Sequence, residues 1–197
     1  MTEQFKVLHV CTGNIGRSPM AERLMRRHLQ ANLGEDAQAF DVRSAGTWGC
    51  AGSSAEDYAL LALNSRGIDA SDFVARELTE NMLNEADLVL TATTEHRGQV
   101  VVMRPSVVRR AFTLREFARL QALVAEQADD AGESTVARAK SRVELAGRVR
   151  GLSERLDPSH DDVEDPLGAP ATFYEARAYD IDQACRRAVD LLVGQRH

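Results

Sequence analysis

Cys11 and Arg17 stand six residues apart in the segment CTGNIGRSPMAE, residues 11–22. A cysteine thiolate is a nucleophile, and the guanidinium of an arginine offers a fixed fork of donors that fits phosphate oxygens. The glycines and Asn14 between them are typical of a tight turn, whose backbone N–H groups can converge on an anion. This combination indicates nucleophilic attack on a phosphoryl group. The competing interpretation is a buried, unreactive cysteine, because a thiol often serves as a small apolar residue.

The segments on either side would place this loop where anions bind. The apolar run FKVLHV, residues 5–10, is rich in branched side chains and predicts a buried strand directly before Cys11. After the loop, apolar residues recur at three- and four-residue spacing, so we expect a helix with Ser18 as its N-cap and Pro19 as its first residue. The loop therefore lies at the carboxyl end of a strand and at the positive end of a helix, which would also favour the Cys11 thiolate.

Strands and helices alternate along the rest of the chain. We expect further strands at residues 39–45, 86–93 and 109–114, and further helices at 55–66, 95–103, 115–127, 134–156 and 172–193. Alternation of this kind implies parallel pairing through right-handed crossovers. We therefore predict an α/β fold, with a four-stranded parallel sheet, helices on both faces and the phosphate loop after the first strand. Residues 134–156 are strongly charged, so much of that helix should face water.

Composition limits the classes of partner and setting. The 197 residues carry a formal net charge of −6, which argues against nucleic acid or an anionic membrane as the main partner. No apolar stretch is long enough for membrane insertion, and the N-terminus shows no leader pattern. Cys11, Cys50 and Cys185 are too widely spaced for a disulfide framework or a metal site. We expect a single cytoplasmic domain over residues 1–197 that needs no metal and no cofactor.

The segment 11–22 resembles the phosphate loop of the low-molecular-weight protein tyrosine phosphatases. Three more segments resemble that family in the same order: SAGTW at 44–48, ADLVLT at 86–91 and DVEDPLG at 162–168. The resemblance covers residues 1–115 and 160–197, whereas 115–160 is longer than is usual in the family. It implies a metal-independent phosphatase that hydrolyses phosphotyrosine in proteins, or small aryl phosphate monoesters, through a cysteinyl-phosphate.

The resemblance also implies roles for individual residues. Cys11 would attack phosphorus, Arg17 and the loop amides would hold the phosphate oxygens, and Asp165 would protonate the leaving oxygen and then activate water. Ser18 would hydrogen-bond Cys11, while Asn14 and Ser44 would brace the loop. The residues expected to bind substrate are Thr12, Gly13, Asn14, Ile15, Gly16, Ser18 and Trp48, the last also being compatible with a core position. Other acid candidates are Asp157, Asp161 and Asp162, but the Asp-Pro-x-Gly order favours Asp165.

Two positions depart from the family pattern. Gly16 stands where many relatives carry a second cysteine that protects the nucleophile, so such protection should be absent or come from elsewhere, for example from Cys50. Leu167 stands where an aromatic residue usually lines the pocket, and Phe173 and Tyr174 are candidates to replace it.

Three alternative functions stay open. Phosphoarginine hydrolases of this type carry Thr where the loop has Ile15, which favours the tyrosine interpretation. Thiol-linked arsenate reduction needs two relay cysteines close together, and Cys50 and Cys185 are far apart. A non-catalytic phosphate-binding or interaction module would not need both a nucleophile and a candidate acid.

Overall fold

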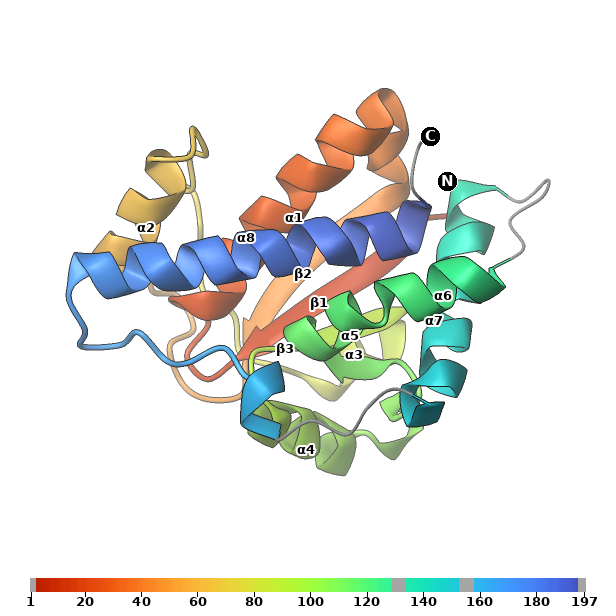
Figure 1. Cartoon of the computed structure of the whole chain (residues 1–197). Helices are drawn as coiled ribbons and strands as arrows, with labels where there is room; N and C mark the ends of the chain where they lie inside the picture. Colours follow the sequence, from red (N-terminus) through yellow and green to blue (C-terminus); the bar gives the residue numbers. More distant parts are fainter. Residues whose placement is uncertain (1–2, 129–133, 153–157, 195–197) are drawn as a thin grey trace.

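A four-stranded parallel sheet in the order β2-β1-β3-β4 forms the centre of the molecule in a computed structural model, which describes residues 3–128, 134–152 and 158–194 (Figure 1). The strands are β1 (Phe5–Cys11), β2 (Phe40–Gly46), β3 (Leu88–Thr91) and β4 (Ala111–Thr113). All three strand pairs are parallel. The predicted α/β fold and its four-stranded parallel sheet are confirmed.

Helices cover both faces of the sheet, as predicted. They are α1 (Arg17–Leu33), α2 (Asp57–Asn64), α3 (Glu80–Glu85), α4 (Thr94–Met103), α5 (Leu114–Arg119), α6 (Gln121–Gln127), α7 (Thr135–Val149) and α8 (Ala171–Val193). Figure 1 shows α8 running across α1, with α4 on the other side of the sheet. Side chains alternate along β1. Phe5 and Val7 therefore belong to a core shared with α1, α5, α7 and α8, whereas Leu8 and Val10 belong to a second core shared with α3 and α4.

Several helix boundaries differ from the predictions. The single helix expected at 115–127 is two helices, because the chain tightens at Leu120, whose N–H bonds to the Phe117 carbonyl three residues back. The short helix α3 was not predicted; its N-cap is Thr79. Of the helix expected at 134–156, α7 ends at Val149 and residues 153–156 lie outside the described part of the chain.

The expectation that this charged helix faces water holds for only part of its surface. One side of α7 is buried and includes Arg142, whose Nη1 donates to the Leu191 carbonyl of α8. At the C-terminal end, Gly147 lies so close to the chain before β4 that a Cβ there would be 2.8 Å from the Arg109 carbonyl oxygen. Helix α7, which lies in segment 115–160, thus packs directly against α8 and against the chain before β4.

The expected N-cap of the first helix is wrong. Helix α1 begins at Arg17 with Gly16 in the N-cap position, so Ser18 lies inside the first turn. The physical reason is that the Ser18 hydroxyl is used elsewhere, in the hydrogen bonds of the loop described below. The early start also places Arg17 at the helix entrance, beside the carboxyl end of β1.

The carboxyl ends of the parallel strands bring distant segments to one edge of the sheet. The loop after β1, the segment after β2 and the start of α4 after β3 meet there. The acidic loop before α8 joins them, because the Val163 N–H donates to the Ala92 carbonyl at 2.8 Å. This edge holds the residues that the sequence singled out.

Candidate active site

The loop after β1 is held open by bonds on its outer side. The carbonyls of Cys11, Thr12 and Ile15 accept hydrogen bonds from the N–H groups of Thr47, Trp48 and Glu56, at 2.9, 3.0 and 2.8 Å. Turning these carbonyls outward lets the intervening N–H groups converge on the interior, as in an anion-binding nest. The entrance of α1 adds the positive end of its dipole to the same place.

Two backbone positions make this shape possible. Asn14 has a φ of 57°, in the left-handed region that asparagine tolerates better than most residues. Gly46, at the end of β2, lies directly against the loop: a Cβ there would be 2.5 Å from the Thr12 carbonyl oxygen and 2.9 Å from the Asn14 nitrogen. Both contacts are with backbone atoms, so the loop cannot adopt this position over a larger residue.

Cys11 lies buried within the loop, with its Sγ 3.0 Å from the Ser18 Oγ. The Asn14 side-chain amide donates to the Ser18 Oγ at 2.8 Å and to the Ser44 Oγ at 2.9 Å. Because Ser18 already accepts a bond from Asn14, its own hydroxyl proton is available for the sulfur. The structure therefore brings together the four residues that the sequence assigned to the nucleophile and its support.

Glu22 and Arg76 extend this network and were not assigned a role from the sequence. The Ser44 hydroxyl donates to the buried Glu22 carboxylate at 2.7 Å, and the Arg76 Nη2 donates to the same oxygen at 3.0 Å. The Arg76 backbone N–H donates to the Asn14 Oδ1 at 2.8 Å. The signal available in the sequence was Glu22 itself, a carboxylate among the apolar residues of the first helix, where a buried charge needs partners.

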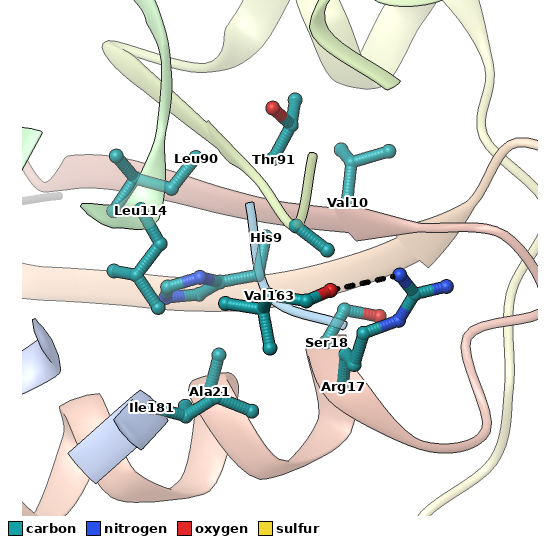
Figure 2. Close-up of a pocket in the computed structure, with 11 residues that line it drawn as sticks. His9, Val10, Arg17, Ser18, Ala21, Leu90, Thr91, Leu114, Val163 and Ile181 are labelled. Carbon is teal, nitrogen blue, oxygen red and sulfur yellow. Dashed lines mark hydrogen bonds between the residues drawn. The ribbon is translucent and has the colours of Figure 1, made fainter. Parts of the chain in front are cut away.

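Arg17 is the cation of the site and is only 6% exposed. Its Nη1 donates to the Val163 carbonyl at 3.1 Å, and its Nη2 donates to the Thr12 Oγ1 at 3.3 Å and to the Asp165 Oδ2. Figure 2 shows Arg17 and Ser18 at the entrance of α1, with the bond from Arg17 to Val163 drawn as a dashed line. Arg17 thus links the loop to the acidic segment before α8.

Among the candidate acids, Asp165 reaches Arg17. Its other oxygen, Oδ1, accepts from the Leu167 N–H at 3.2 Å, and the side chain is 48% exposed. Asp161 is held instead by two bonds from Arg119, each 2.9 Å long. Asp162 accepts from the Thr94 N–H at 2.7 Å, at the start of α4. Asp157 lies outside the described residues. Asp161 and Asp162 therefore anchor the loop that presents Asp165.

His96, which the sequence analysis did not single out, also reaches the loop. Its Nε2 lies 2.9 Å from the Thr12 Oγ1 and its Nδ1 lies 2.6 Å from the Thr93 Oγ1. Burial and the charge of Arg17 lower the pKa of His96 to about 4, so the ring is neutral near pH 7. The sequence signal was its position just after a parallel strand, at the edge where the other strands end.

Two cavities adjoin Arg17. The open one has a volume of about 570 Å³ and is bordered by Thr12, Thr47, His96 and Asp165. The other, of about 10 Å³, lies behind the loop, and Figure 2 shows His9 of β1 on its wall. Burial, together with the charge of Arg26, lowers the pKa of His9 to about 3. The open cavity has the size of a ligand site, whereas the inner one is no larger than a water molecule needs.

Other predicted residues lie around rather than inside this cavity. Trp48 is 75% exposed, which removes the core interpretation, and Leu167 is 62% exposed. Phe173 lies under the Arg177 guanidinium, and Tyr174 is buried edge-on against Tyr58. Neither takes the place of an aromatic at Leu167 on the wall of the open cavity.

Cys50 lies against the outside of the loop. A Cβ on Gly13 would be 3.0 Å from the Cys50 Sγ, while Cys11, Cys50 and Cys185 are all free thiols. Whether Cys50 protects Cys11 stays a prediction.

Two further features concern the described residues as a whole. Within residues 3–128, 134–152 and 158–194, histidine, cysteine and carboxylate side chains form no group of three that could ligate a metal ion. No helix there combines the length and the apolar character needed to cross a bilayer.

Comparison with known proteins agrees with this geometry. The family model described as low molecular weight phosphotyrosine protein phosphatase matches residues 6–130. The probable low molecular weight protein-tyrosine-phosphatase AmsI of Erwinia amylovora is 36% identical over 101 residues, which are 51% of this chain and 65% of that protein. A protein-arginine-phosphatase of Geobacillus stearothermophilus is 30% identical over 152 residues, 77% of this chain and 96% of that protein.

A solved structure shares the fold over nearly its whole length. The low molecular weight protein tyrosine phosphatase from T. tengcongensis superimposes with a TM-score of 0.68 at 29% identity, covering 95% of this chain and 99% of that one. Sequence, fold and the loop around Cys11 lead to one assignment: the chain belongs to the low molecular weight phosphotyrosine protein phosphatase family.

Proposed function

We propose that this chain hydrolyses phosphotyrosine, or related aryl phosphate monoesters, through a cysteinyl-phosphate on Cys11. The observation that carries the proposal is the placement of Cys11 inside a loop that also presents Arg17, whose Nη2 donates to Asp165. Nucleophile, anion-binding cation and acid therefore border one site. We further propose that the chain forms a single domain and works in a reducing compartment such as the cytoplasm, which would keep its three thiols free.

The first chemical step is the transfer of the phosphoryl group to sulfur. The Cys11 thiolate attacks phosphorus, the S–P bond forms and the bond from phosphorus to the ester oxygen breaks. Arg17 and the loop N–H groups neutralise the phosphoryl oxygens. Asp165 gives its proton to the leaving oxygen, which is a far better leaving group as a neutral phenol.

Hydrolysis of the intermediate completes the cycle. Asp165, now a carboxylate, takes a proton from water, whose oxygen attacks phosphorus while the S–P bond breaks and Cys11 leaves as a thiolate. The Ser18 hydroxyl at 3.0 Å stabilises the sulfur anion both before attack and on departure. Phosphate then leaves, and Asp165 holds the proton that it took from water. It gives this proton to the next leaving oxygen, or releases it to solvent when its carboxylate pairs with Arg17 again.

The surroundings of the site favour a long, flat substrate side chain. Cys11 is buried, so the phosphate must be carried past the rim of the loop. Ile15 lies half-buried in the loop. Trp48 bonds through its N–H to the Thr12 carbonyl, Leu167 bonds through its N–H to Asp165, and both side chains present exposed apolar surface. A phenyl ring matches this apolar rim and positions its phosphate ester over the sulfur.

Arginine phosphate is the second candidate substrate, and one observation favours it. The Geobacillus relative named protein-arginine-phosphatase aligns over 96% of its length, whereas the tyrosine phosphatase AmsI aligns over 65%. Against it stands Ile15, since phosphoarginine hydrolases of this type carry Thr there. Exchanging this one side chain therefore tests the choice directly.

The test is a panel of peptides of one sequence that carry phosphotyrosine, phosphoserine, phosphothreonine or phosphoarginine, assayed with a metal chelator present. We expect hydrolysis of the phosphotyrosine peptide, no activity in Cys11→Ser, and a shift toward phosphoarginine in Ile15→Thr. If the wild-type chain preferred the phosphoarginine peptide, phosphoarginine would replace phosphotyrosine as the proposed substrate. An active Cys11→Ser variant would contradict the mechanism.

A further inference from the structure

We propose that His96 is a positioning residue of the phosphate site, which fixes the direction of the Arg17 guanidinium through the hydroxyl of Thr12. The inference rests on the proposed function of the loop, because it concerns how the phosphate-binding cation is held. His96 borders the open cavity but meets the loop through the Thr12 hydroxyl, so the role proposed for it needs no contact with the phosphate.

The contacts form a continuous chain from Arg17 to helix α4. The Arg17 Nη2 donates to the Thr12 Oγ1 at 3.3 Å. The Thr12 Oγ1 lies 2.9 Å from the His96 Nε2, and the His96 Nδ1 lies 2.6 Å from the Thr93 Oγ1. The Thr12 hydroxyl is thus held between a cation in its own loop and a ring from a segment 84 residues later.

The donors along this chain can be assigned in one direction. Because Arg17 donates to the Thr12 oxygen, the Thr12 hydroxyl proton can be donated to the His96 Nε2. The neutral ring then carries its proton on Nδ1 and donates it to Thr93. In this arrangement the Arg17 Nη2–H, the Thr12 hydroxyl and the His96 Nδ1–H each meet an acceptor, and the lone pair of Thr12 that faces Arg17 is fixed.

Arg17 needs such a fixed acceptor at the moment of substrate binding. In the free chain its Nη2 end is held by both Thr12 and Asp165. A phosphate group entering the loop competes with Asp165 for that end, while Nη1 keeps its bond to the Val163 carbonyl. Thr12 is then the protein acceptor that remains at Nη2. If the Thr12 hydroxyl changed its orientation, this end of the guanidinium would be free to rotate.

His96 is itself held rigidly enough to serve this purpose. It is only 6% exposed and lies in the first turn of α4, where the Thr93 Oγ1 also accepts its backbone N–H at 3.2 Å. Asp162 accepts the N–H of Thr94, two residues earlier in that turn, and ties the helix start to the acidic loop. The charged groups that face the ring are Arg17, Asp162 and Asp165, and its burial keeps it uncharged near neutral pH.

Two substitutions of His96 separate its two hydrogen bonds. The amide of Gln extends to about the position of Nε2 and can still meet Thr12, whereas the amide of Asn reaches only the position of Nδ1 and Thr93. We expect His96→Asn to lower kcat/KM for an aryl phosphate by about tenfold, because a misdirected binding group loses much of its effect. His96→Gln should stay close to wild type. His28→Asn, which changes a histidine of α1 that is bonded to Asp182 of α8, is the matched control and should leave kcat/KM unchanged.

A double-mutant cycle tests the route through Thr12. Thr12→Val removes the hydroxyl at nearly constant shape and should match the loss of His96→Asn. The double variant should be no worse than either single one, because both break the same link. Losses that multiply, or a His96→Gln variant as impaired as His96→Asn, would overturn the proposal.

Two readouts do not depend on turnover. Affinity for inorganic phosphate, measured by calorimetry, should fall in His96→Asn and Thr12→Val but not in His96→Gln. The Arg17 side-chain N–H signal in the ¹⁵N NMR spectrum, assigned with Arg17→Lys, should broaden or shift in the same two variants. An unchanged signal and unchanged affinity in Thr12→Val would contradict the proposal even if His96→Asn failed to fold. If the wild-type chain hydrolysed no phosphoester, the proposed function would fail while these two measurements still decided the role of His96.

Discussion

Arg17 and Asp165 form an ion pair across 148 residues of sequence, with the Arg17 Nη2 2.5 Å from the Asp165 Oδ2. The guanidinium is buried and the carboxylate is half exposed, so the cation is fixed and the anion is the partner that can move. A phosphate group would compete with Asp165 for the same N–H groups. We therefore expect substrate binding to release the candidate acid from Arg17.

Asp165→Asn separates the two roles of this carboxylate. With poor leaving groups, kcat should fall by about 10²-fold or more, because no proton reaches the departing oxygen. With a leaving group that needs no proton, the loss should be much smaller. Inhibition by inorganic phosphate should become stronger, since no carboxylate competes for Arg17. Steady-state kinetics over a series of substituted aryl phosphates measure all three effects.

Glu164→Gln is the control for that experiment. Glu164 is the neighbouring carboxylate, but it is exposed and pairs with Arg177 at 2.8 Å instead of Arg17. Glu164→Gln should leave kcat unchanged for every aryl phosphate of the leaving-group series. An equal loss of Asp165→Asn across the whole series would remove Asp165 from the role of acid.

Gly46→Ala tests whether the loop depends on close backbone contact with β2. The added Cβ would be 2.5 Å from the Thr12 carbonyl oxygen, and backbone atoms cannot yield by rotating a side chain. We expect loss of phosphate binding and a fall in kcat/KM of about 10²-fold, because the binding groups move together. Gly98→Ala in α4 meets nothing within 4 Å and should stabilise that helix by up to about 1 kcal/mol. A fully active Gly46→Ala enzyme would show that the loop does not need this packing.

Glu22 is predicted to hold the loop through Ser44. Glu22→Ala leaves the buried Ser44 hydroxyl without its carboxylate acceptor, so the free energy of unfolding should fall by about 2 kcal/mol and kcat/KM should fall with it. Glu22→Gln keeps an acceptor for Ser44 and should lose less of both. Urea unfolding and aryl phosphate kinetics on the pair of variants check this order, and equal effects of Ala and Gln would argue against a role through Ser44.

Two buried histidines predict acid sensitivity of the fold. In the folded chain the pKa of His9 is lowered to about 3 and that of His96 to about 4, from 6.5. Between pH 6.5 and 4 the unfolded chain therefore binds more protons, and the free energy of unfolding decreases as the pH falls. Each histidine contributes a loss of about 2 kcal/mol between pH 7 and pH 5.

His9→Gln isolates one of these two contributions. Its change in unfolding free energy between pH 7 and pH 5 should be smaller than that of wild type by about 2 kcal/mol, because Gln does not titrate. Urea titrations at the two pH values give this difference directly. The same pH dependence in variant and wild type would mean that folding does not lower the pKa of His9.

The sequence predicted the part of the site that is local. Cys11, Asn14, Arg17 and Ser18 lie within one turn-and-helix segment, so strand and helix patterns were enough to place them together. The predicted cap at Ser18 failed because cap propensity describes an isolated helix end, and here the hydroxyl bonds within the loop.

The contacts that sequence reasoning missed depend on distant segments. Arg76 and His96 reach the loop because parallel strands end at one edge, and Glu22, although it lies in α1, meets its partners Ser44 and Arg76 only there. The pairing register that creates this edge is a property of the whole sheet. The split of the helix expected at 115–127 likewise follows from packing, since Leu120 is fully buried at the break. Local propensity carries no information on either.

The most direct test of the central claim is to quench the chain during turnover of an aryl phosphate and locate the phosphoryl group by peptide mass spectrometry. The mechanism predicts a phosphate adduct on the peptide that contains Cys11, bound through sulfur and absent from Cys11→Ser, which should be inactive. Turnover that continues in Cys11→Ser, or an adduct on any other residue, would contradict it.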